Sequence, residues 1–256
     1  MMTPRGILLD LEGVLYEGEA VVPGAVEAVE ALRAMGAGLR FLTNTTVLPR
    51  ADIAGRLARL GFDAAKAEVF TPPLAARRLI ENAGLRRIHL AAEPRLAADF
   101  EGFEIVACSP DAVILGDLYR GFDWDRLDAL HAMLRSGARL VALHKNRVQR
   151  RDGKIALDLG PFVAALEYAA GIEAAVVGKP ARTFFEMALA DLGVGAAAAL
   201  MVGDDIEADI GGAQAAGIRA VQVRTGKFTA RDLDHGSVIP DARIDSIADL
   251  PALVAA

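Results

Sequence analysis

Two acidic residues, Asp10 and Glu12, end the apolar stretch ILLDLEG near the start of the chain. Residues two apart on an extended strand share a face, so both carboxylates can point into one site. A second acidic group comes much later, in VGDDIEAD, which holds Asp204, Asp205 and Asp209. Carboxylates can act as nucleophiles, as general acids or bases, or as ligands of a hard cation. The chemistry to look for is therefore carried by acids near both ends of the chain.

Short apolar stretches and longer helical patterns alternate around these acids. The stretches predicted as strands are residues 6–10, 39–46, 174–178, 197–205 and 218–226. The segments predicted as helices are residues 22–38, 49–62, 180–193 and 206–217. Buried strands that alternate with helices of this length form parallel sheets with helices on both faces. The sequence predicts an α/β fold whose core is a Rossmann-like, doubly wound parallel sheet.

The middle of the chain predicts a second α/β module, at roughly residues 76–175. It contains a further unit of strand, helix and strand over residues 111–144. A polar segment follows, in which the Asp152-Gly153 step favours a hairpin turn. This module separates residues 1–75 from residues 176–256, which together form the first one.

Polar side chains gather where strands of the first module end, and ligands of parallel α/β sheets bind at the carboxyl ends of strands. These side chains are Asp10 and Glu12, Thr43 and Asn44, Lys179, and Asp204 and Asp205 with Asp209 shortly after. Carboxylates that meet in a small volume cost several kcal/mol unless a cation neutralises them or protons are retained. Mg²⁺ suits one or two carboxylates together with water and phosphate. We therefore expect a magnesium site, to which Lys179 adds positive charge.

The motifs DLEGVL, LTNTT, VGKP and VGDDIEAD resemble, in order and form, the four motifs of the haloacid dehalogenase superfamily. The resemblance covers nearly the whole chain, and the insert resembles the class II cap of the nitrophenyl-phosphatase and phosphoglycolate-phosphatase branch. It implies a catalytic core of residues 1–75 and 176–256 and a cap domain of residues 76–175 that selects the substrate. The activity it implies is Mg²⁺-dependent hydrolysis of small phosphorylated compounds.

The resemblance also implies roles for the acids. Asp10 would be the nucleophile that forms an aspartyl-phosphate. The metal would be held by Asp10, Asp204 and the backbone carbonyl of Glu12. Asp205 and Asp209 would lie behind these ligands and position the metal's waters and the nearby lysine.

Basic and polar residues complete the implied site. Thr43 and the backbone of Asn44 would hydrogen-bond the transferring phosphoryl group, and Lys179 would neutralise its charge. Lys145 and Arg147, in the polar segment of the cap, are our candidates for contacts with an anionic substrate. Each has an ordinary structural alternative, because such charges usually form a solvated face and polar residues after a strand often only cap a turn or helix.

Glu12 departs from the superfamily, whose active members usually have aspartate two residues after the nucleophile. That aspartate protonates the leaving group and then activates water, which is worth roughly 10²–10⁴-fold in rate. Glutamate is one methylene longer and must fold back to reach the same point. We expect an impaired or altered acid/base that favours pyrophosphate, phosphoamidates or aryl phosphates. The alternative is a catalytically weak phosphate-binding or regulatory protein.

Composition bounds the remaining possibilities. The single cysteine cannot form an internal disulfide, and no apolar run reaches the roughly 18 residues of a membrane span. A net charge of −6 argues mildly against nucleic-acid binding. A dehalogenase would share the aspartate nucleophile but would leave the acids of VGDDIEAD unexplained. We expect a cytoplasmic phosphatase with a small phosphorylated substrate, no nucleic-acid or membrane partner and, by resemblance, a homodimer through the cap.

Overall fold

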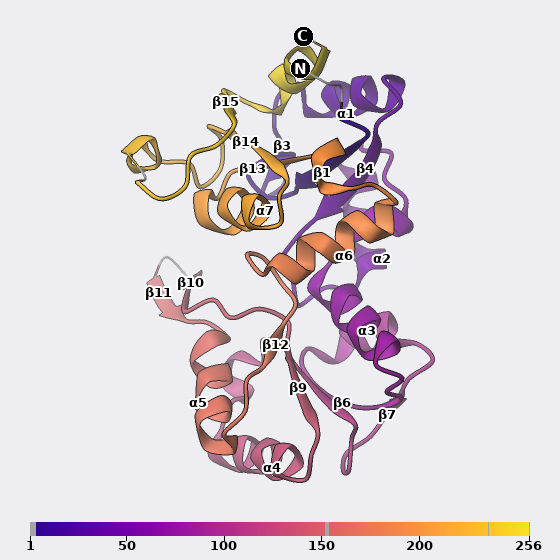
Figure 1. Ribbon diagram of the computed structural model, residues 1–256, viewed down its shortest axis with the longest axis vertical. Helices are drawn as coiled ribbons and strands as arrows, with labels where there is room; N and C mark the ends of the chain where they lie inside the picture. Colours follow the sequence, from indigo (N-terminus) through magenta and orange to yellow (C-terminus); the bar gives the residue numbers. More distant parts are fainter. Residues whose placement is uncertain (1–3, 152–153, 235, 256) are drawn as a thin grey trace. The chain divides into compact units, whose positions relative to one another are not determined.

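The computed structural model describes residues 4–151, 154–234 and 236–255 (Figure 1). Contacts divide the chain into two compact units. The first comprises Met1–Thr43, Arg50–Phe70 and Lys179–Ala256, and the second comprises Asn44–Pro49 and Thr71–Gly178. Most of the second unit is thus an insertion into the first, and the division falls at residues 70/71 and 178/179 rather than at the expected 75/76 and 175/176. The substrate-selecting role expected of the insert stays a prediction.

A parallel six-stranded sheet forms the centre of the first unit, in the order β15-β14-β13-β1-β4-β5. Its strands are β1 (Gly6–Asp10), β4 (Gly38–Leu42), β5 (Val69–Phe70), β13 (Ala199–Gly203), β14 (Arg219–Val223) and β15 (Ala242–Ile244). Every residue of β1 and β13 is buried, which accounts for their continuous apolar sequences. Because β1 pairs with both β13 and β4, its last residue, Asp10, lies at the same edge as the residues that follow those strands.

Helices flank this sheet and complete the predicted α/β architecture. They are α1 (Ala25–Ala34), α2 (Arg50–Arg59), α6 (Arg182–Leu192), α7 (Gly212–Ala215) and α8 (Leu250–Ala255). In α6, Phe184 and Phe185 are fully buried, and Phe184 packs edge-on against Phe70 of β5 with ring centroids 5.2 Å apart. The helix predicted over residues 206–217 is instead a π-helical segment, Ile206–Gly211, followed by the short α7.

A small hairpin follows β1. Its strands are β2 (Tyr16–Glu17) and β3 (Ala20–Val21), which pair antiparallel around the turn at Gly18. Arg56 of α2 holds this turn from the side. Its guanidinium lies 4.5 Å from the centre of the Tyr16 ring, and its Nη2 donates a hydrogen bond of 2.6 Å to the Gly18 carbonyl. The hairpin is therefore tied to α2 within the first unit.

The second unit has its own parallel sheet, in the order β12-β9-β8-β6-β7. Its strands are β6 (Arg87–Ala91), β7 (Glu104–Ile105), β8 (Ala112–Leu115), β9 (Arg139–Ala142) and β12 (Ala175–Val176). Its helices are α3 (Pro72–Asn82), α4 (Trp124–Arg135) and α5 (Gly160–Ala170). Buried side chains of the sheet, α4 and α5, among them Val113, Leu130 and Val163, form one apolar core. The strand expected at residues 174–178 is β12, so it belongs to this sheet and not to the first.

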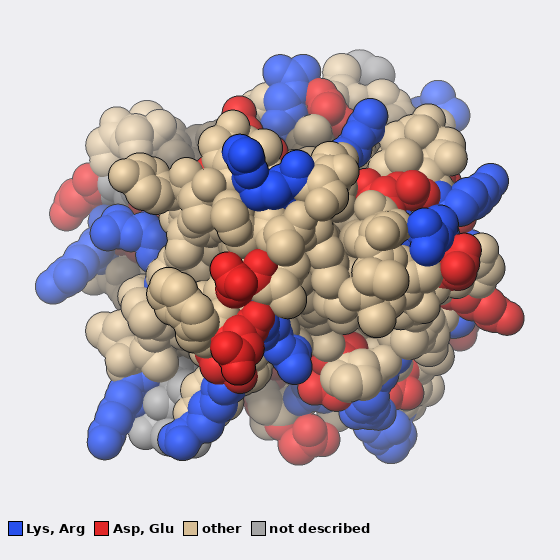
Figure 2. Space-filling model, turned by 90° about the horizontal axis from the view of Figure 1, so that it is seen from below, with Lys and Arg blue, Asp and Glu red and all other residues tan. Residues whose placement is uncertain are grey.

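The polar segment of the second unit forms an antiparallel hairpin of β10 (Val148–Arg151) and β11 (Lys154–Leu157). The turn predicted at Asp152-Gly153 lies outside the described residues. On the face shown in Figure 2, acidic and basic side chains are interspersed and form no continuous patch of either sign among the residues drawn in colour. The described helices include none that is both long and apolar enough to cross a membrane.

Candidate active site

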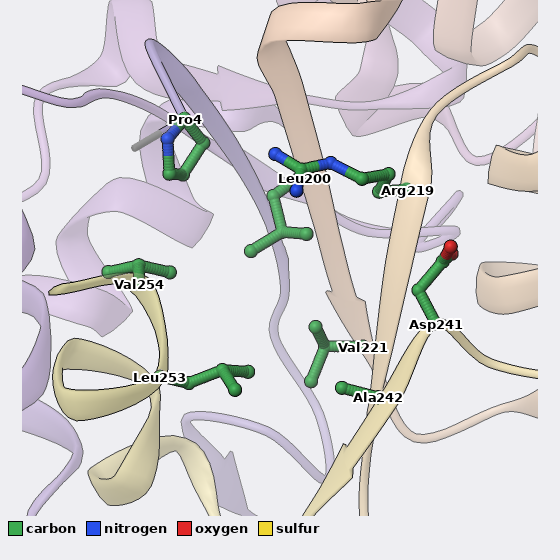
Figure 3. Close-up of a pocket in the computed structure, with 8 residues that line it drawn as sticks. All are labelled: Pro4, Leu200, Arg219, Val221, Asp241, Ala242, Leu253 and Val254. Carbon is green, nitrogen blue, oxygen red and sulfur yellow. The ribbon is translucent and has the colours of Figure 1, made fainter. Parts of the chain in front are cut away.

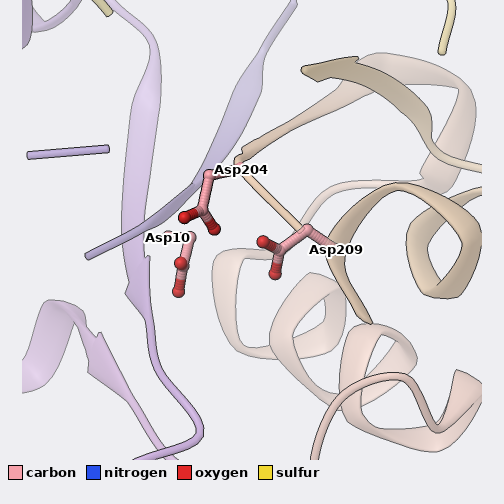
Figure 4. A group of neighbouring side chains, drawn as sticks. All are labelled: Asp10, Asp204 and Asp209. Carbon is pink, nitrogen blue, oxygen red and sulfur yellow. The ribbon is translucent and has the colours of Figure 1, made fainter. Parts of the chain in front are cut away.

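Three acids meet at the carboxyl edge of the first sheet. Asp10 is the last residue of β1, Asp204 follows β13 directly, and Asp209 comes from the π-helical segment. Figure 4 shows their carboxylates turned toward one another, and one oxygen from each lies within 4.8 Å of the others. All three are buried, with exposed fractions of 7% for Asp10, 1% for Asp204 and 0% for Asp209. The strands therefore gather three carboxylates away from bulk water, as the sequence predicted for Asp10 and Asp204.

Lys179 lies among these acids and is itself only 4% exposed. Its Nζ donates hydrogen bonds of 2.6 Å to Asp10 Oδ1 and of 2.6 Å to Asp209 Oδ1. Burial alone would lower the pKa of Lys179, but the charges and hydrogen bonds of Asp10 and Asp209 raise the pKa above its ordinary value. The lysine therefore stays protonated and neutralises part of the acidic charge.

One ammonium group does not balance three carboxylates. Burial raises the pKa of Asp204 to about 6, against the lowering effect of the Lys227 N–H. Burial likewise raises the pKa of Asp209 to about 6, with a further contribution from the charge of Asp10. The pKa of Asp10 is also raised by burial, although Lys179 opposes the shift. A further positive charge at this point would therefore stabilise the ionised site.

The contacts of Asp204 fit a divalent cation. Its Oδ2 accepts a hydrogen bond of 2.7 Å from the Lys227 N–H, whereas its buried Oδ1 has no hydrogen-bond partner among the described residues. A buried carboxylate oxygen left without a partner is costly and calls for an explanation. Oxygen ligands are what Mg²⁺ prefers, so the donor set here suits that ion.

The Asp205 carboxylate is engaged by neighbouring groups, and its expected role behind the metal ligands stays a prediction. Its Oδ1 accepts from the backbone N–H groups of Glu207 and Ala208 at 3.1 and 2.9 Å, and its Oδ2 pairs with Lys227 Nζ at 3.1 Å. This carboxylate caps the π-helical segment, as polar residues that follow a strand often do. Its backbone N–H, however, donates to Asp209 Oδ2 at 3.2 Å. Asp205 thus contacts the cluster through its main chain.

The π-helical segment explains how two acids four residues apart take different directions. The N–H groups of Asp209 and Ile210 both donate to the Asp205 carbonyl, at 3.0 and 3.2 Å, which widens the turn. Such single π turns occur frequently at functional sites. In this one, Asp205 faces the backbone of the segment while Asp209 faces Lys179. A regular α-helix, as predicted from the sequence, has no such widened turn.

The Glu12 side chain is exposed, and its Oε1 accepts a hydrogen bond of 2.8 Å from the Gly18 N–H at the tip of the hairpin. The resemblance implies an impaired or altered acid/base role for this side chain and metal binding by its backbone carbonyl. In the structure the carboxylate stabilises the hairpin turn through this bond, and its role as an acid or base stays a prediction.

The remaining predicted residues belong to different parts of the chain. Thr43 is buried just after β4, and its N–H donates to the Phe70 carbonyl at 3.3 Å. Asn44 begins the segment that groups with the second unit. Lys145 and Arg147 also belong to that unit, where they line an open hollow beside the start of α5. Lys145 Nζ is paired there with Glu167 Oε2 at 2.7 Å.

Sequence reasoning missed the loop after β14. The Lys227 N–H binds Asp204, and the buried Gln222 donates through Nε2 to the Asp204 carbonyl at 3.4 Å. The strand-end rule that identified the acids could have found this loop, because the predicted strand 218–226 also ends in polar residues. A separate hollow lies near the amino ends of β13, β14 and β15, lined mainly by apolar side chains such as Leu200, Val221 and Leu253 (Figure 3). It lies at the opposite ends of these strands from Asp204.

Two family models and a phosphatase relative match most of this chain. Residues 7–106 match the family model described as haloacid dehalogenase-like hydrolase, and residues 176–250 match a HAD-hydrolase-like model. Phospholysine phosphohistidine inorganic pyrophosphate phosphatase from Bos taurus is 42% identical over 251 residues, which are 96% of this chain and 92% of the relative.

Solved structures of phosphatases are also similar to this chain. The p-nitrophenyl phosphatase from Archaeoglobus fulgidus is 25% identical with a TM-score of 0.90, covering 98% of this chain and 99% of that one. Glycerol phosphate phosphatase from Mycobacterium tuberculosis, in complex with magnesium, is 29% identical with a TM-score of 0.83, covering 97% of this chain and 76% of that one. The chain therefore belongs to the haloacid dehalogenase-like hydrolases, among their phosphatases.

Proposed function

We propose that this protein hydrolyses small phosphorylated compounds with the help of Mg²⁺, through an aspartyl-phosphate formed on Asp10. One observation carries the proposal: Asp10, Asp204 and Asp209 are buried together around Lys179 at the edge of the sheet where ligands of such folds bind. The same arrangement supports phosphoryl transfer, in which positioning and electrostatics supply most of the rate.

The residues suited to hold the metal are Asp10, Asp204 and the backbone carbonyl of Glu12. When bound, Mg²⁺ neutralises charge between an anionic nucleophile and an anionic phosphate and polarises the phosphoryl oxygens. The relative's structure that contains magnesium supports this choice of ion. Asp209 belongs to the same group of acids, and its hydrogen bond from Lys179 gives it the task of holding the lysine in place.

The chain's own residues account for the covalent steps. Lys179 holds one oxygen of Asp10 and favours the ionised, nucleophilic form of this carboxylate. A carboxylate oxygen attacks phosphorus, the bond from phosphorus to the leaving group breaks, and the leaving group departs with the electron pair. Water then hydrolyses the aspartyl-phosphate, which releases phosphate and regenerates Asp10. Thr43 and Asn44 stay our candidates for contacts with the phosphoryl group, as Lys145 and Arg147 do for the rest of the substrate.

The position of the Glu12 side chain favours substrates whose leaving groups need little protonation. Its carboxylate accepts a hydrogen bond from the Gly18 N–H. This side chain is therefore poorly placed to protonate a poor leaving group. Pyrophosphate, phosphoamidates and aryl phosphates need little such help. The names of the bovine relative and of the archaeal p-nitrophenyl phosphatase point to the same substrate classes.

Replacing Glu12 by aspartate is expected to speed hydrolysis of an alkyl phosphate such as glycerol phosphate by roughly 10²-fold, the lower end of general acid–base effects. The shorter side chain gives up the Gly18 hydrogen bond and restores the acid position usual in the superfamily. Comparison of kcat/KM for glycerol phosphate and p-nitrophenyl phosphate measures the effect, with little change expected for the second substrate. Glu12→Gln, which keeps an acceptor for Gly18 but no acid, is the control. No gain with aspartate would contradict the leaving-group argument.

Mg²⁺ is expected to raise the melting temperature of the wild-type protein and to have little effect on Asp204→Asn. An ion that binds only the folded state stabilises it by about 2.7 kcal/mol at a hundred times its dissociation constant. The apparent affinity should fall between pH 7 and pH 5, since protons compete with the ion for Asp204, whose pKa is raised to about 6. Thermal melts at several Mg²⁺ concentrations and both pH values check this. Equal shifts in both proteins would exclude Asp204 as a ligand.

A second candidate function is a phosphate-binding or regulatory protein with little turnover, which the engaged carboxylate of Glu12 favours. Phosphate release from a panel of phosphoesters and pyrophosphate, with and without Mg²⁺, separates the two. Turnover that needs Mg²⁺ supports the hydrolase, and Mg²⁺ binding without turnover supports the alternative. The cytoplasmic location and the homodimer through the cap stay predictions.

A further inference from the structure

We propose that the loop Thr225–Lys227 is a clamp that fixes the orientation of Asp204 for metal binding, with Thr225 as its positioning residue. The inference rests on the proposed Mg²⁺-dependent function and assigns a task to residues that the superfamily motifs do not include. All the contacts that carry it lie within the first unit.

The loop leaves only one carboxylate oxygen of Asp204 without a hydrogen-bond partner among the described residues. The Lys227 N–H holds Asp204 Oδ2 at 2.7 Å, and Oδ1 is left buried without a partner among the described residues. The Lys227 side chain is anchored in turn, because its Nζ pairs with Asp205 Oδ2 at 3.1 Å. The loop therefore decides which oxygen of Asp204 is available to a cation.

Two backbone segments approach each other closely over this carboxylate. Gly13 and Gly226 have φ angles of +85° and +66°, and a Cβ atom on either would collide with the Asp204 carboxylate. Each added Cβ would also meet the Cα of the other glycine. Side chains are therefore excluded at both positions, and the two main chains enclose Asp204 from the turn after β1 and from the loop after β14.

Two hydrogen bonds hold the loop after β14 and the turn after β1 together. Thr225 Oγ1 donates a hydrogen bond of 2.5 Å to the Gly13 carbonyl, and the Gly226 N–H donates one of 2.8 Å to Glu17 Oε1 in the hairpin. Both bonds join the loop to the segment that follows Asp10. If they are lost, the Lys227 N–H is no longer held against Asp204, and the carboxylate gains freedom to rotate. Partners that orient metal ligands typically change metal affinity by about 10- to 100-fold when they are removed.

The test compares Thr225→Val with Thr225→Ser in the full-length protein. Valine keeps the shape of threonine without the hydroxyl, and serine keeps the hydroxyl. Titration calorimetry with MgCl₂ and no substrate should show roughly tenfold weaker binding for the valine variant and a change below about twofold for the serine variant. The loss of activity toward p-nitrophenyl phosphate in the valine variant should shrink as Mg²⁺ is raised, because the clamp acts on the metal ligand and not on the reacting atoms.

A second pair of variants keeps the proposal testable if Thr225→Val does not fold. Glu17 and Glu19 are exposed acids of the same hairpin, and Glu19 pairs instead with Arg56 at 3.3 Å. Glu17→Ala should weaken Mg²⁺ binding severalfold, and Glu19→Ala should leave it unchanged. Wild-type affinity in Thr225→Val, equal losses in the valine and serine variants, or equal effects at Glu17 and Glu19 would each overturn the clamp. Absence of Mg²⁺ binding to the wild type itself would overturn the proposed function, and the clamp with it.

Discussion

Asp10→Asn is expected to reduce phosphate release by roughly 10⁴-fold or more, the scale of loss seen when a nucleophile is removed from a catalytic unit. The amide nitrogen and oxygen of asparagine are far weaker nucleophiles than a carboxylate, so the aspartyl-phosphate cannot form. The side chain keeps its size and an oxygen that can accept the hydrogen bond now made by Lys179 at 2.6 Å. Steady-state phosphate release from pyrophosphate and p-nitrophenyl phosphate measures the loss.

Two controls tie that loss to chemistry. The melting temperature of Asp10→Asn should stay near that of the wild type, because the change removes one buried negative charge and keeps the packing. Mass spectrometry of acid-quenched reactions should detect a phosphoryl adduct on the wild-type protein and none on the variant. Retention of even a tenth of the wild-type rate would rule out Asp10 as the nucleophile.

Lys179→Met is expected to destabilise the Mg²⁺-free protein by about 3–5 kcal/mol, the range for breaking a buried ion pair from one side. The change leaves Asp10 and Asp209 buried without their shared hydrogen-bond donor. It should also abolish most activity, since the orientation of the nucleophile is lost. Urea denaturation at pH 8 measures the free energy of unfolding. Arg182→Met, which removes an exposed pair with Glu186, should change it by less than about 0.5 kcal/mol.

The loss of unfolding free energy in Lys179→Met should be larger at pH 8 than at pH 5. Burial already raises the pKa values of Asp10 and Asp209, and loss of the lysine raises them further. Acids whose pKa is higher in the folded than in the unfolded state stabilise the fold at low pH and lose that contribution as pH rises. The variant should therefore recover stability relative to the wild type between pH 8 and pH 5, and added Mg²⁺ should have a similar effect at pH 8. A deficit that does not change with pH or Mg²⁺ would argue that Lys179 acts through packing alone.

Much of this site could be predicted because it depends on periodicity and charge. Apolar stretches that end in Asp10 and Asp204 are buried parallel strands, and parallel strands bring their carboxyl ends to one edge. The cost of grouping carboxylates then predicts a compensating cation, and Lys179 is found among them. The α/β fold and its Rossmann-like sheet are confirmed on the same grounds.

The remaining details depend on local geometry that leaves little trace in the sequence. The direction of the Glu12 side chain depends on a hairpin whose strands have only two residues each, too few to show a periodic pattern. The cap made by Asp205 depends on a single widened turn over Ile206–Gly211. The grouping of Asn44–Pro49 with the second unit depends on contacts with residues distant in sequence, for which so short a stretch gives no signal.

The interrupted first unit has a consequence for how such enzymes diversify. Asp10, Lys179, Asp204 and Asp209 all lie outside Thr71–Gly178, and Lys179 is the first residue after that stretch ends. A recombination event with junctions at residues 70/71 and 178/179 would exchange the inserted stretch for that of a homologue and leave all four side chains in place. If the insert selects the substrate, as predicted, such an exchange would change specificity and leave the reaction chemistry intact.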